Sequence, residues 1–115
     1  MLVGVKRIYD KPSITDGKRI FVDRLWPRGV KKSTVNIDIW MKEVAPSDEL
    51  RQWFNHELEK WDGFRKKYRD ELATNKHLEE LMALVKSSDV TLLYSAKDIE
   101  HNNAVVLAEM LREKL

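Results

Sequence analysis

Short apolar runs along the chain predict three β-strands, at residues 2–9, 18–25 and 90–94. Residues 20–22 and 90–94 are apolar at successive positions, as in strands that are covered on both faces. Residues 10–13 and 15–17 have turn-forming composition and separate the first two strands. The segment 26–29 ends the second strand, because the residue before a proline stays extended and a glycine turns freely.

Helical spacing of apolar residues predicts helices in the middle of the chain and at its end. The five groups are Ile37, Trp40, Met41 and Val44; Leu50, Trp53, Phe54 and Leu58; Trp61, Phe64, Tyr68 and Leu72; Leu78, Leu81, Met82 and Val85; and Ala104, Leu107, Ala108 and Leu111. Asn36, Ser47 and Asn102 precede three of these groups and suit the N-cap position. An Asp38–Lys42 pair at i,i+4 is expected on the outer face of the first helix.

This order of elements predicts one domain over residues 1–115, of α/β (or α+β) class. We expect a small mixed sheet of about three strands covered by four to five helices. The pattern leaves open whether the last strand runs parallel to the first. A length of 115 residues suits a single domain, and no Pro, Gly or Ser-rich linker divides the chain.

Composition excludes several classes of chemistry. The chain has no cysteine, which excludes disulfides, thiol nucleophiles and thiolate metal sites. Its three histidines lack metal-ligand spacing, and it has neither a glycine-rich phosphate loop nor a nucleophile motif, so we expect no metal and no cofactor. No apolar run is long enough to cross a membrane. The first residues become charged at Lys6 and lack a signal-peptide core, so we expect a cytoplasmic protein.

Charge is unevenly distributed along the chain. Residues 1–32 hold nine basic and three acidic residues, a net charge of +6, whereas the rest of the chain carries −4. A basic first quarter indicates an anionic partner. The alternative is that its lysines lie on strand edges, where they discourage edge-to-edge pairing.

The first candidate site segment is residues 23–29 (DRLWPRG), directly after a buried strand. A charged side chain there is paired, hydrated or directed at a ligand, because burying it alone is costly. Arg24 and Arg28 both have the forked guanidinium that binds phosphate or carboxylate. The alternative is an internal Asp–Arg network that braces the sheet edge.

The second candidate segment is residues 95–103, which lead from the strand at 90–94 into the last helix. In open α/β sheets ligands bind at such strand ends, where the helix N-terminus favours an anion. Lys97 supplies a charge, Asn102 a cap, and His101 an acid–base group. The alternative is ordinary capping by Asp98 or Asn102, with Lys97 and His101 in water.

The remaining site candidates have less support in the sequence. His56 lies beside an aromatic group and is more typical of a hydrogen-bonded residue at a helix end, and His77 of a surface residue. The basic run over residues 65–69 can contact a nucleic-acid backbone, but its helical spacing is more typical of a solvated face.

Three segments resemble the YeaO-like branch of a bacterial and archaeal domain-of-unknown-function family: residues 17–29 (GKRIFVDRLWPRG), 45–56 (APSDELRQWFNH) and 92–102 (LLYSAKDIEHN). The resemblance extends over nearly the whole chain and implies a small cytosolic α/β protein with no established activity. Its pattern carries over to Arg19, Asp23, Arg24, Trp26, Arg28, Trp40, Lys42, Ser47, Arg51, His56, Lys97, Asp98, His101 and Asn102. Many of these are polar or charged, which a packing scaffold alone does not require.

Three hypotheses on function follow. The leading one is a pocket between residues 23–29 and 95–103 that binds a small anion, such as a nucleotide or another phosphate-bearing metabolite. Its ligand-binding candidates are Arg19, Arg24, Trp26, Arg28, Arg51, Lys97 and Asn102, and its catalytic candidates, if it is an enzyme, are His101, His56, Asp23 and Asp98. The second hypothesis is a nucleic-acid-binding module that uses the basic N-terminal stretch and residues 65–69. The third is a structural or oligomerising domain; the sequence leaves the oligomeric state open.

Overall fold

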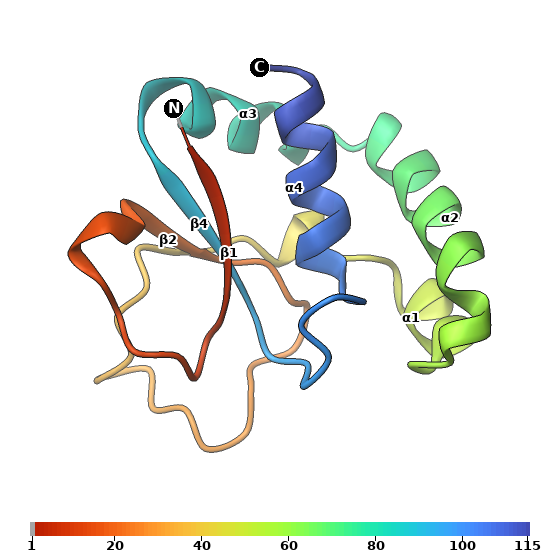
Figure 1. Ribbon diagram of the computed structural model, residues 1–115, viewed down its shortest axis with the longest axis horizontal. Coiled ribbons are helices and arrows are strands. Elements are labelled where there is room, and N and C mark those ends of the chain that lie inside the picture. The colour runs from red at the N-terminus through yellow and green to blue at the C-terminus, as the bar shows by residue number, and fades with distance from the viewer. Residues whose placement is uncertain (1) are drawn as a thin grey trace.

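The computed structural model describes residues 2–115 and contains a four-stranded parallel sheet with helices packed on it (Figure 1). The strands are β1 (Val3–Arg7), β2 (Lys18–Phe21), β3 (Ile39–Trp40) and β4 (Val90–Tyr94); the helices are α1 (Asp48–Phe54), α2 (Trp61–Ala73), α3 (His77–Ser87) and α4 (Asn103–Glu113). Single 3₁₀ turns span Ile14–Asp16, Lys42–Val44 and Leu58–Lys60. The predicted α/β class is confirmed.

The strand order is β1-β4-β2-β3, and all three pairs of neighbours are parallel. The last strand along the chain therefore enters between the first two, with Leu92 opposite both Val5 and Ile20. This position explains why β4 is buried along its whole length. The sheet has four parallel strands where we expected a mixed sheet of about three.

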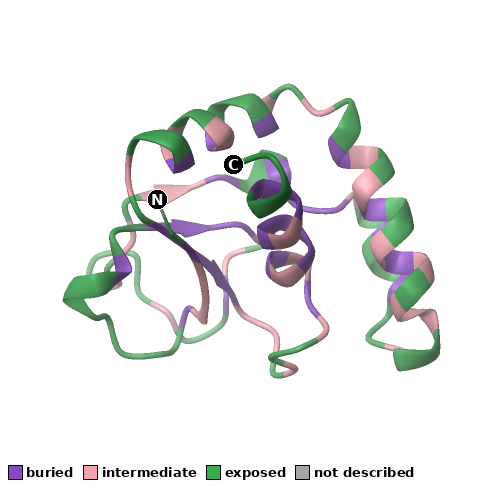
Figure 2. Cartoon of the chain, turned by 45° about the horizontal axis from the view of Figure 1, so that its top comes forward, coloured by how far each residue is buried: buried purple, intermediate pink, exposed green. Residues whose placement is uncertain are grey.

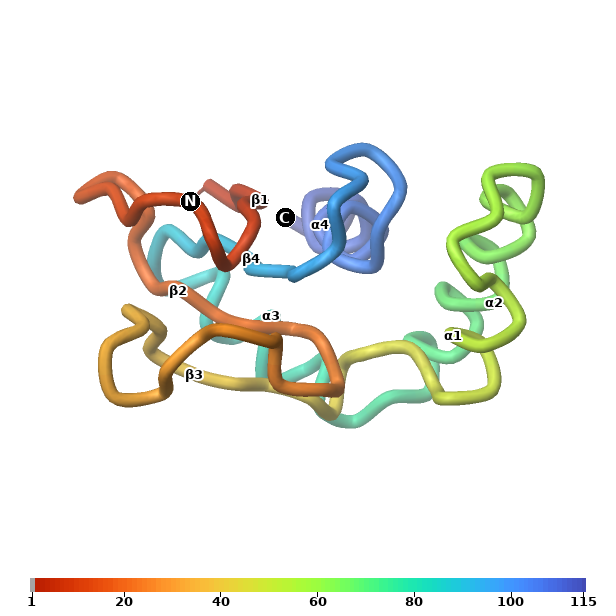
Figure 3. Tube along the Cα trace, turned by 90° about the horizontal axis from the view of Figure 1, so that it is seen from below, coloured from red at the N-terminus to blue at the C-terminus, as the bar shows by residue number. Residues whose placement is uncertain are grey.

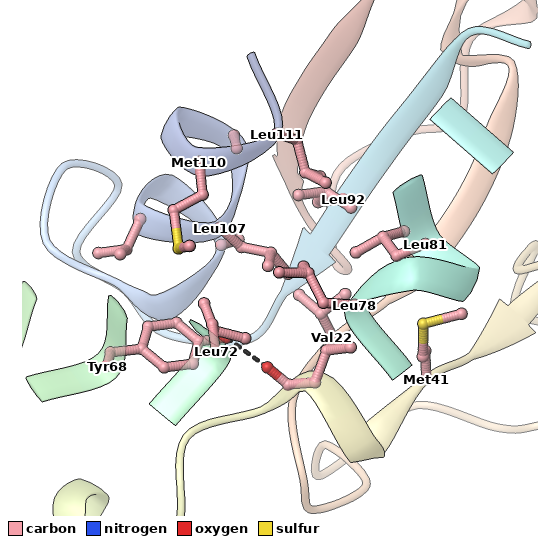
Figure 4. Close-up of a cluster of buried hydrophobic side chains, with 14 of the residues drawn as sticks. Val22, Met41, Tyr68, Leu72, Leu78, Leu81, Leu92, Leu107, Met110 and Leu111 are labelled. Carbon is pink, nitrogen blue, oxygen red and sulfur yellow. Dashed lines mark hydrogen bonds between the residues drawn. The ribbon is translucent and has the colours of Figure 1, made fainter. Parts of the chain in front are cut away.

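The two faces of the sheet are covered differently. Side chains of Ile20, Val22 and Leu92 join the main hydrophobic cluster with residues of α2, α3 and α4 (Figure 4). On the other face Phe21, Leu93 and Ile8 pack against Trp40 of β3 and against Trp26 and other residues of the segment between β2 and β3. Figure 3 shows α1, α2 and α4 together on one side of the strands. In Figure 2 the buried residues follow the strands and the inward sides of the helices.

The predicted helix around residues 36–44 is wrong. Ile39–Trp40 instead forms the edge strand β3, and only a 3₁₀ turn follows it. Backbone hydrogen bonds to β2 replace the helical ones: the Asp38 amide donates to the Arg19 carbonyl at 2.8 Å and the Met41 amide to the Phe21 carbonyl at 2.8 Å. The apolar stripe also divides between the two faces, since Ile37 and Trp40 join one cluster while Met41 and Val44 join the other.

The other predicted helices are confirmed as α1 to α4, and two predicted caps with them. The Ser47 side chain accepts a hydrogen bond from the Leu50 amide, and the Asn102 side chain accepts one from the Val105 amide. Asn36 caps no helix; its carbonyl accepts from the Arg19 side chain. Among residues 2–115 no helix combines the length and apolar character that a membrane span requires.

Candidate functional site

A cleft of about 390 Å³ opens at the carboxyl ends of three neighbouring strands. Tyr9 follows β1, residues 23–28 follow β2, and residues 95–96 and 101–103 follow β4; α1 and α2 supply the opposite wall. These segments meet at the lower end of the sheet in Figure 1. The carboxyl ends of parallel strands are the usual ligand-binding edge of such sheets. The structure therefore brings both predicted site segments to one cleft.

Four predicted residues come from the turn after β2: Asp23, Arg24, Trp26 and Arg28 all line the cleft. Two tryptophans that pack on the sheet hold the backbone of this turn. The Trp40 indole nitrogen donates to the Asp23 carbonyl at 2.8 Å, and the Trp26 indole donates to the Val30 carbonyl at 2.7 Å. The Trp26 and Trp40 rings pack edge to face, with centroids 5.1 Å apart. Rigid packing thus fixes the backbone that carries the two arginines.

The three cleft arginines differ in the hydrogen bonds and ion pairs that they form within the protein. Arg24 donates to the carbonyls of Pro46 and Ala45 at 3.3 and 3.4 Å, and its Nε lies 3.8 Å from an Asp48 carboxylate oxygen. Arg51 reaches the same oxygen at 3.2 Å. Arg28 is exposed, and its guanidinium has no hydrogen bond or ion pair within residues 2–115. The largely exposed Asp48 carboxylate thus pairs with Arg24 and Arg51, and Arg28 stays without a partner among the described residues.

Asp23 is hydrogen-bonded to Ser95, the residue that directly follows the central strand β4. The Ser95 amide and hydroxyl both donate to Asp23 Oδ2, at 3.0 and 2.7 Å. Burial raises the pKa of Asp23 above its usual value, and the hydrogen bonds from Ser95 oppose that rise without cancelling it. The cleft therefore holds a carboxyl group that binds a proton more readily than an exposed aspartate.

Helix α1 and the turn that ends it add two predicted residues, Arg51 and His56, to the cleft. Its start is fixed by Glu71 of α2, whose carboxylate accepts from the Ser47 amide at 2.9 Å and from the Ser47 hydroxyl at 2.6 Å. Its end is marked by Asn55 and His56, which both have positive φ, of 46° and 55°. The exposed His56 ring therefore lies beyond the helix, tilted against Phe54 with centroids 6.0 Å apart.

The loop after β4 divides its predicted residues between binding and structural positions. His101 and Asn102 line the cleft, whereas Asp98 and the exposed Lys97 are not among its lining residues. Asp98 accepts from the amides of Glu100 and His101, and these hydrogen bonds lower its pKa. It also lies 3.0 Å from His101 Nδ1. Asn102 is buried, caps α4 and donates to the Asp98 carbonyl, so its polar atoms are used within the protein.

Arg19 lies away from the cleft, at the start of β2. It is 3% exposed, its Nη1 lies 2.5 Å from the Asp16 carboxylate, and its Nε donates to the Asn36 carbonyl. Lys6 binds the second Asp16 oxygen at 2.8 Å. The structure thus gives Arg19 an internal partner at the opposite end of the strand and does not bring it to the other candidates.

The Asp16 ion pair predicts acid sensitivity. Burial alone would raise the pKa of Asp16, but hydrogen bonds from Lys6, the Ser13 amide and Arg19 outweigh it and lower the pKa from 3.8 to about 2. A carboxylate whose folded pKa is lowered stabilises the fold above its unfolded pKa and loses that contribution as the pH falls. We expect the free energy of unfolding to decrease between about pH 4 and pH 2. Urea unfolding at stepped pH measures this, and Asp16→Asn should show a shallower decrease; equal decreases would contradict the assignment.

Basic residues predicted as a nucleic-acid footprint are partly engaged in ion pairs. Arg65 and Arg69 on α2 both bind Glu109 of α4, at 2.7 and 3.2 Å, and Arg69 also binds Glu113 at 2.8 Å. In the N-terminal stretch Lys6 and Arg19 pair with Asp16, and Arg7 donates to the carbonyls of Ser95 and Ala96. These five basic side chains therefore have partners within the protein. No group of three or more potential metal ligands occurs among the described residues.

Several cleft residues were not named individually as site candidates, although Ser95 and Asn103 lie within the predicted segment 95–103. Ser95, Tyr9, Phe64 and Asn103 all line it, and Asn103 donates to the Val22 carbonyl at 3.0 Å. The sequence does contain a signal for Ser95 as a site residue, because it directly follows the apolar run of β4 just as Asp23 follows residues 20–22. Phe64 had none, since it belongs to the apolar stripe of α2.

Comparison with known proteins finds relatives that match nearly the whole chain. The chain is 46% identical over 113 residues to "Uncharacterized protein YeaO" of Escherichia coli K12, covering 97% of this chain and 98% of that protein. It is 40% identical over 109 residues to "Uncharacterized protein Rv3073c" of Mycobacterium tuberculosis H37Rv, covering 95% of this chain and 92% of that protein. No solved structure matches it. The family description "Inactive DUF488-N3 subclade" matches residues 2–115, and the chain therefore belongs to this branch of the DUF488 family.

Proposed function

We propose that this protein binds a small anionic metabolite, one that bears a phosphate or nucleotide group, in the cleft at the carboxyl ends of β1, β4 and β2. The observation that carries the proposal is the convergence of Arg24, Arg28 and Arg51 on that cleft. Guanidinium groups bind phosphate and carboxylate through paired, charge-assisted hydrogen bonds. Asp48 pairs with two of them, Arg24 and Arg51, and Asp23 is the one acidic residue in the lining, so the three guanidinium groups leave an excess of positive charge at the site.

The shape and lining of the cleft support an organic anion over a bare inorganic ion. Its volume of about 390 Å³ lies within the range of small-molecule sites, roughly 300–1,000 Å³. The rings of Trp26, Phe54 and Phe64 line it together with the arginines. An apolar wall beside a cationic rim suits a ligand with a charged end and a less polar body.

Helix α4 adds to the positive potential. It is 11 residues long and begins at the cleft, where Asn102 and Asn103 belong to the lining. The N-terminus of a helix carries a partial positive charge that stabilises a nearby anion. The arginines and the helix end therefore favour the same charge on the ligand.

Binding without turnover is the form of the function that we propose. The matching family description is that of an inactive subclade, and the chain lacks the cysteine that a thiol nucleophile needs. The predicted acid–base roles of His101, His56, Asp23 and Asp98 stay predictions, for which the Asp98–His101 contact supplies the geometry of an oriented imidazole.

Replacing Arg28 tests the proposal. The guanidinium has no partner among the described residues, so Arg28→Ala should leave the melting temperature of the free protein unchanged within about 2 °C. We expect it to weaken the binding of inorganic phosphate and of AMP by about tenfold or more, the usual effect of removing a charged hydrogen-bond donor. Isothermal titration calorimetry at low ionic strength measures both affinities.

Lys31→Ala is the matched control. Lys31 carries the same charge in an exposed position of the same loop and does not line the cleft. If both variants weaken binding equally, the attraction is a general effect of net charge and not of the cleft. If neither phosphate nor AMP binds the unmodified protein, the proposed function is wrong.

A further inference from the structure

The floor of the cleft carries a hydrogen-bond acceptor that the protein leaves unused. Both hydrogen bonds from Ser95 go to Asp23 Oδ2, and Asp23 Oδ1 has no hydrogen-bond partner among residues 2–115. The Asn103 amide lies close enough to help lower the Asp23 pKa, but the hydrogen bond that it forms goes to the Val22 carbonyl at 3.0 Å. No fully buried side-chain nitrogen or oxygen of the described residues lacks a partner, so Oδ1 keeps accessible surface. Asp23 lines the cleft, and Oδ1 is the carboxyl oxygen that Ser95 leaves free to meet a ligand there.

Ser95 fixes the orientation of this acceptor. Its amide and its hydroxyl hold Oδ2 at 3.0 and 2.7 Å from two directions, which prevents the carboxyl group from turning freely. The backbone on either side is also held, since the Trp40 indole binds the Asp23 carbonyl and the Val22 amide binds the Leu93 carbonyl. An acceptor placed so firmly costs little conformational entropy when a ligand binds to it.

A second acceptor lines the same cleft. Asp98 lies 3.0 and 3.1 Å from His101 Nδ1, and a carboxylate at that distance requires the ring hydrogen on Nδ1 in the neutral imidazole. His101 Nε2 has no hydrogen-bond partner within the described chain, and in the neutral ring it is an acceptor. The edge-to-face contact with Trp61, with centroids 5.1 Å apart, holds the plane of the ring.

We infer that the anion bound here also carries hydroxyl groups, and that Asp23 Oδ1, with His101 Nε2, accepts hydrogen bonds from them. The chemical class is a phosphorylated polyol or sugar phosphate, nucleotides included. This inference rests on the proposed anion binding, to which it adds what the rest of the ligand must look like. The arginines hold the phosphate, and the acceptors hold hydroxyls.

The charges in the cleft separate these two parts of the ligand. A phosphate placed against Asp23 would meet a carboxylate and would find no donor there apart from a captured proton. A hydroxyl placed against the same oxygen supplies the missing donor. A site that hydrogen-bonds a hydroxyl strongly rejects the analogue that lacks it, because its own polar atom is then left unpaired.

The test compares three probes on the unmodified protein: inorganic phosphate, butyl phosphate and ribose 5-phosphate. All three present phosphate oxygens, but only the sugar phosphate has hydroxyl donors on its body. We expect ribose 5-phosphate to bind about tenfold or more tightly than butyl phosphate in calorimetric titrations. Equal affinities would overturn the inference while leaving anion binding intact. Absence of binding by all three would instead overturn the proposed function.

Asp23→Asn sharpens the test on the protein side. Asparagine keeps the size of the side chain and an oxygen for the Ser95 donors, but it turns an amide NH₂ toward the cleft in place of an acceptor. We expect the variant to lose the preference for ribose 5-phosphate over butyl phosphate. The matched control is Asp70→Asn, an exposed aspartate of α2 that does not line the cleft. If Asp23→Asn keeps the full preference for the sugar phosphate, the acceptor role of Asp23 is refuted. The probe series uses the unmodified protein, so it tests the hydroxyl preference even if the variant misfolds.

Discussion

Asp16→Ala is expected to lower the free energy of unfolding by about 3–5 kcal/mol, the cost typical of leaving one partner of a buried ion pair alone. Arg19 is 3% exposed and Asp16 is 6% exposed, so water cannot replace the lost carboxylate. The same carboxylate also accepts from Lys6 and from the Ser13 amide, which closes the cap of the 3₁₀ turn Ile14–Asp16. Urea unfolding followed by circular dichroism measures the change.

Two further variants isolate the cause. Asp70→Ala removes an exposed aspartate from α2 and should change stability by less than about 0.5 kcal/mol. The double variant Asp16→Ala with Arg19→Met also removes the unpaired charge of Arg19. We expect it to recover most of the lost free energy of unfolding. If the double variant is as unstable as Asp16→Ala alone, the buried charge is not the reason for the loss.

Gly17→Ala should be similarly damaging, with an expected loss of about 3 kcal/mol or more. Gly17 has a φ of 64°, and a Cβ at this position would lie 2.3 Å from the Asp89 carbonyl oxygen. That oxygen accepts from the Lys18 amide at 2.9 Å at the start of the pairing between β2 and β4. An added methyl group therefore forces the backbone apart where two central strands begin.

Gly29→Ala is the control for backbone conformation. Gly29 has a φ of 75°, but an added Cβ would have no atom within 4 Å. It should lose only about 1–2 kcal/mol, the penalty of a left-handed conformation for a residue with a side chain. Equal losses at both glycines would show that the contact with Asp89 adds nothing, and thermal or urea unfolding of the two variants decides between these outcomes.

The cleft shows how far a site at the ends of the strands can be predicted from the sequence. Asp23 and His101 were expected at one site because each follows a buried strand, and the structure places both in the same cleft. Arg51 and His56 were singled out as well, although no local pattern says that α1 closes the cleft; Glu71, 24 residues along the chain from Ser47, fixes the start of that helix. Arg19 has the same residue type as Arg24 and lies only five residues away, yet it faces an internal carboxylate.

By itself the sequence determined the elements whose signals are local. Helices α1 and α4 have side-chain caps at Ser47 and Asn102, and the stripes of α2 and α3 repeat at helical spacing, so each helix is encoded within about a dozen neighbouring residues. Tertiary structure alone decided what β3 would be, because the apolar residues of segment 37–44 have helical spacing but the backbone there forms its hydrogen bonds with the edge of β2. It also decided that β4 enters between β1 and β2. That insertion brings Ser95 to Asp23 across 72 residues, a contact that depends on packing of the whole sheet and that no local pattern encodes.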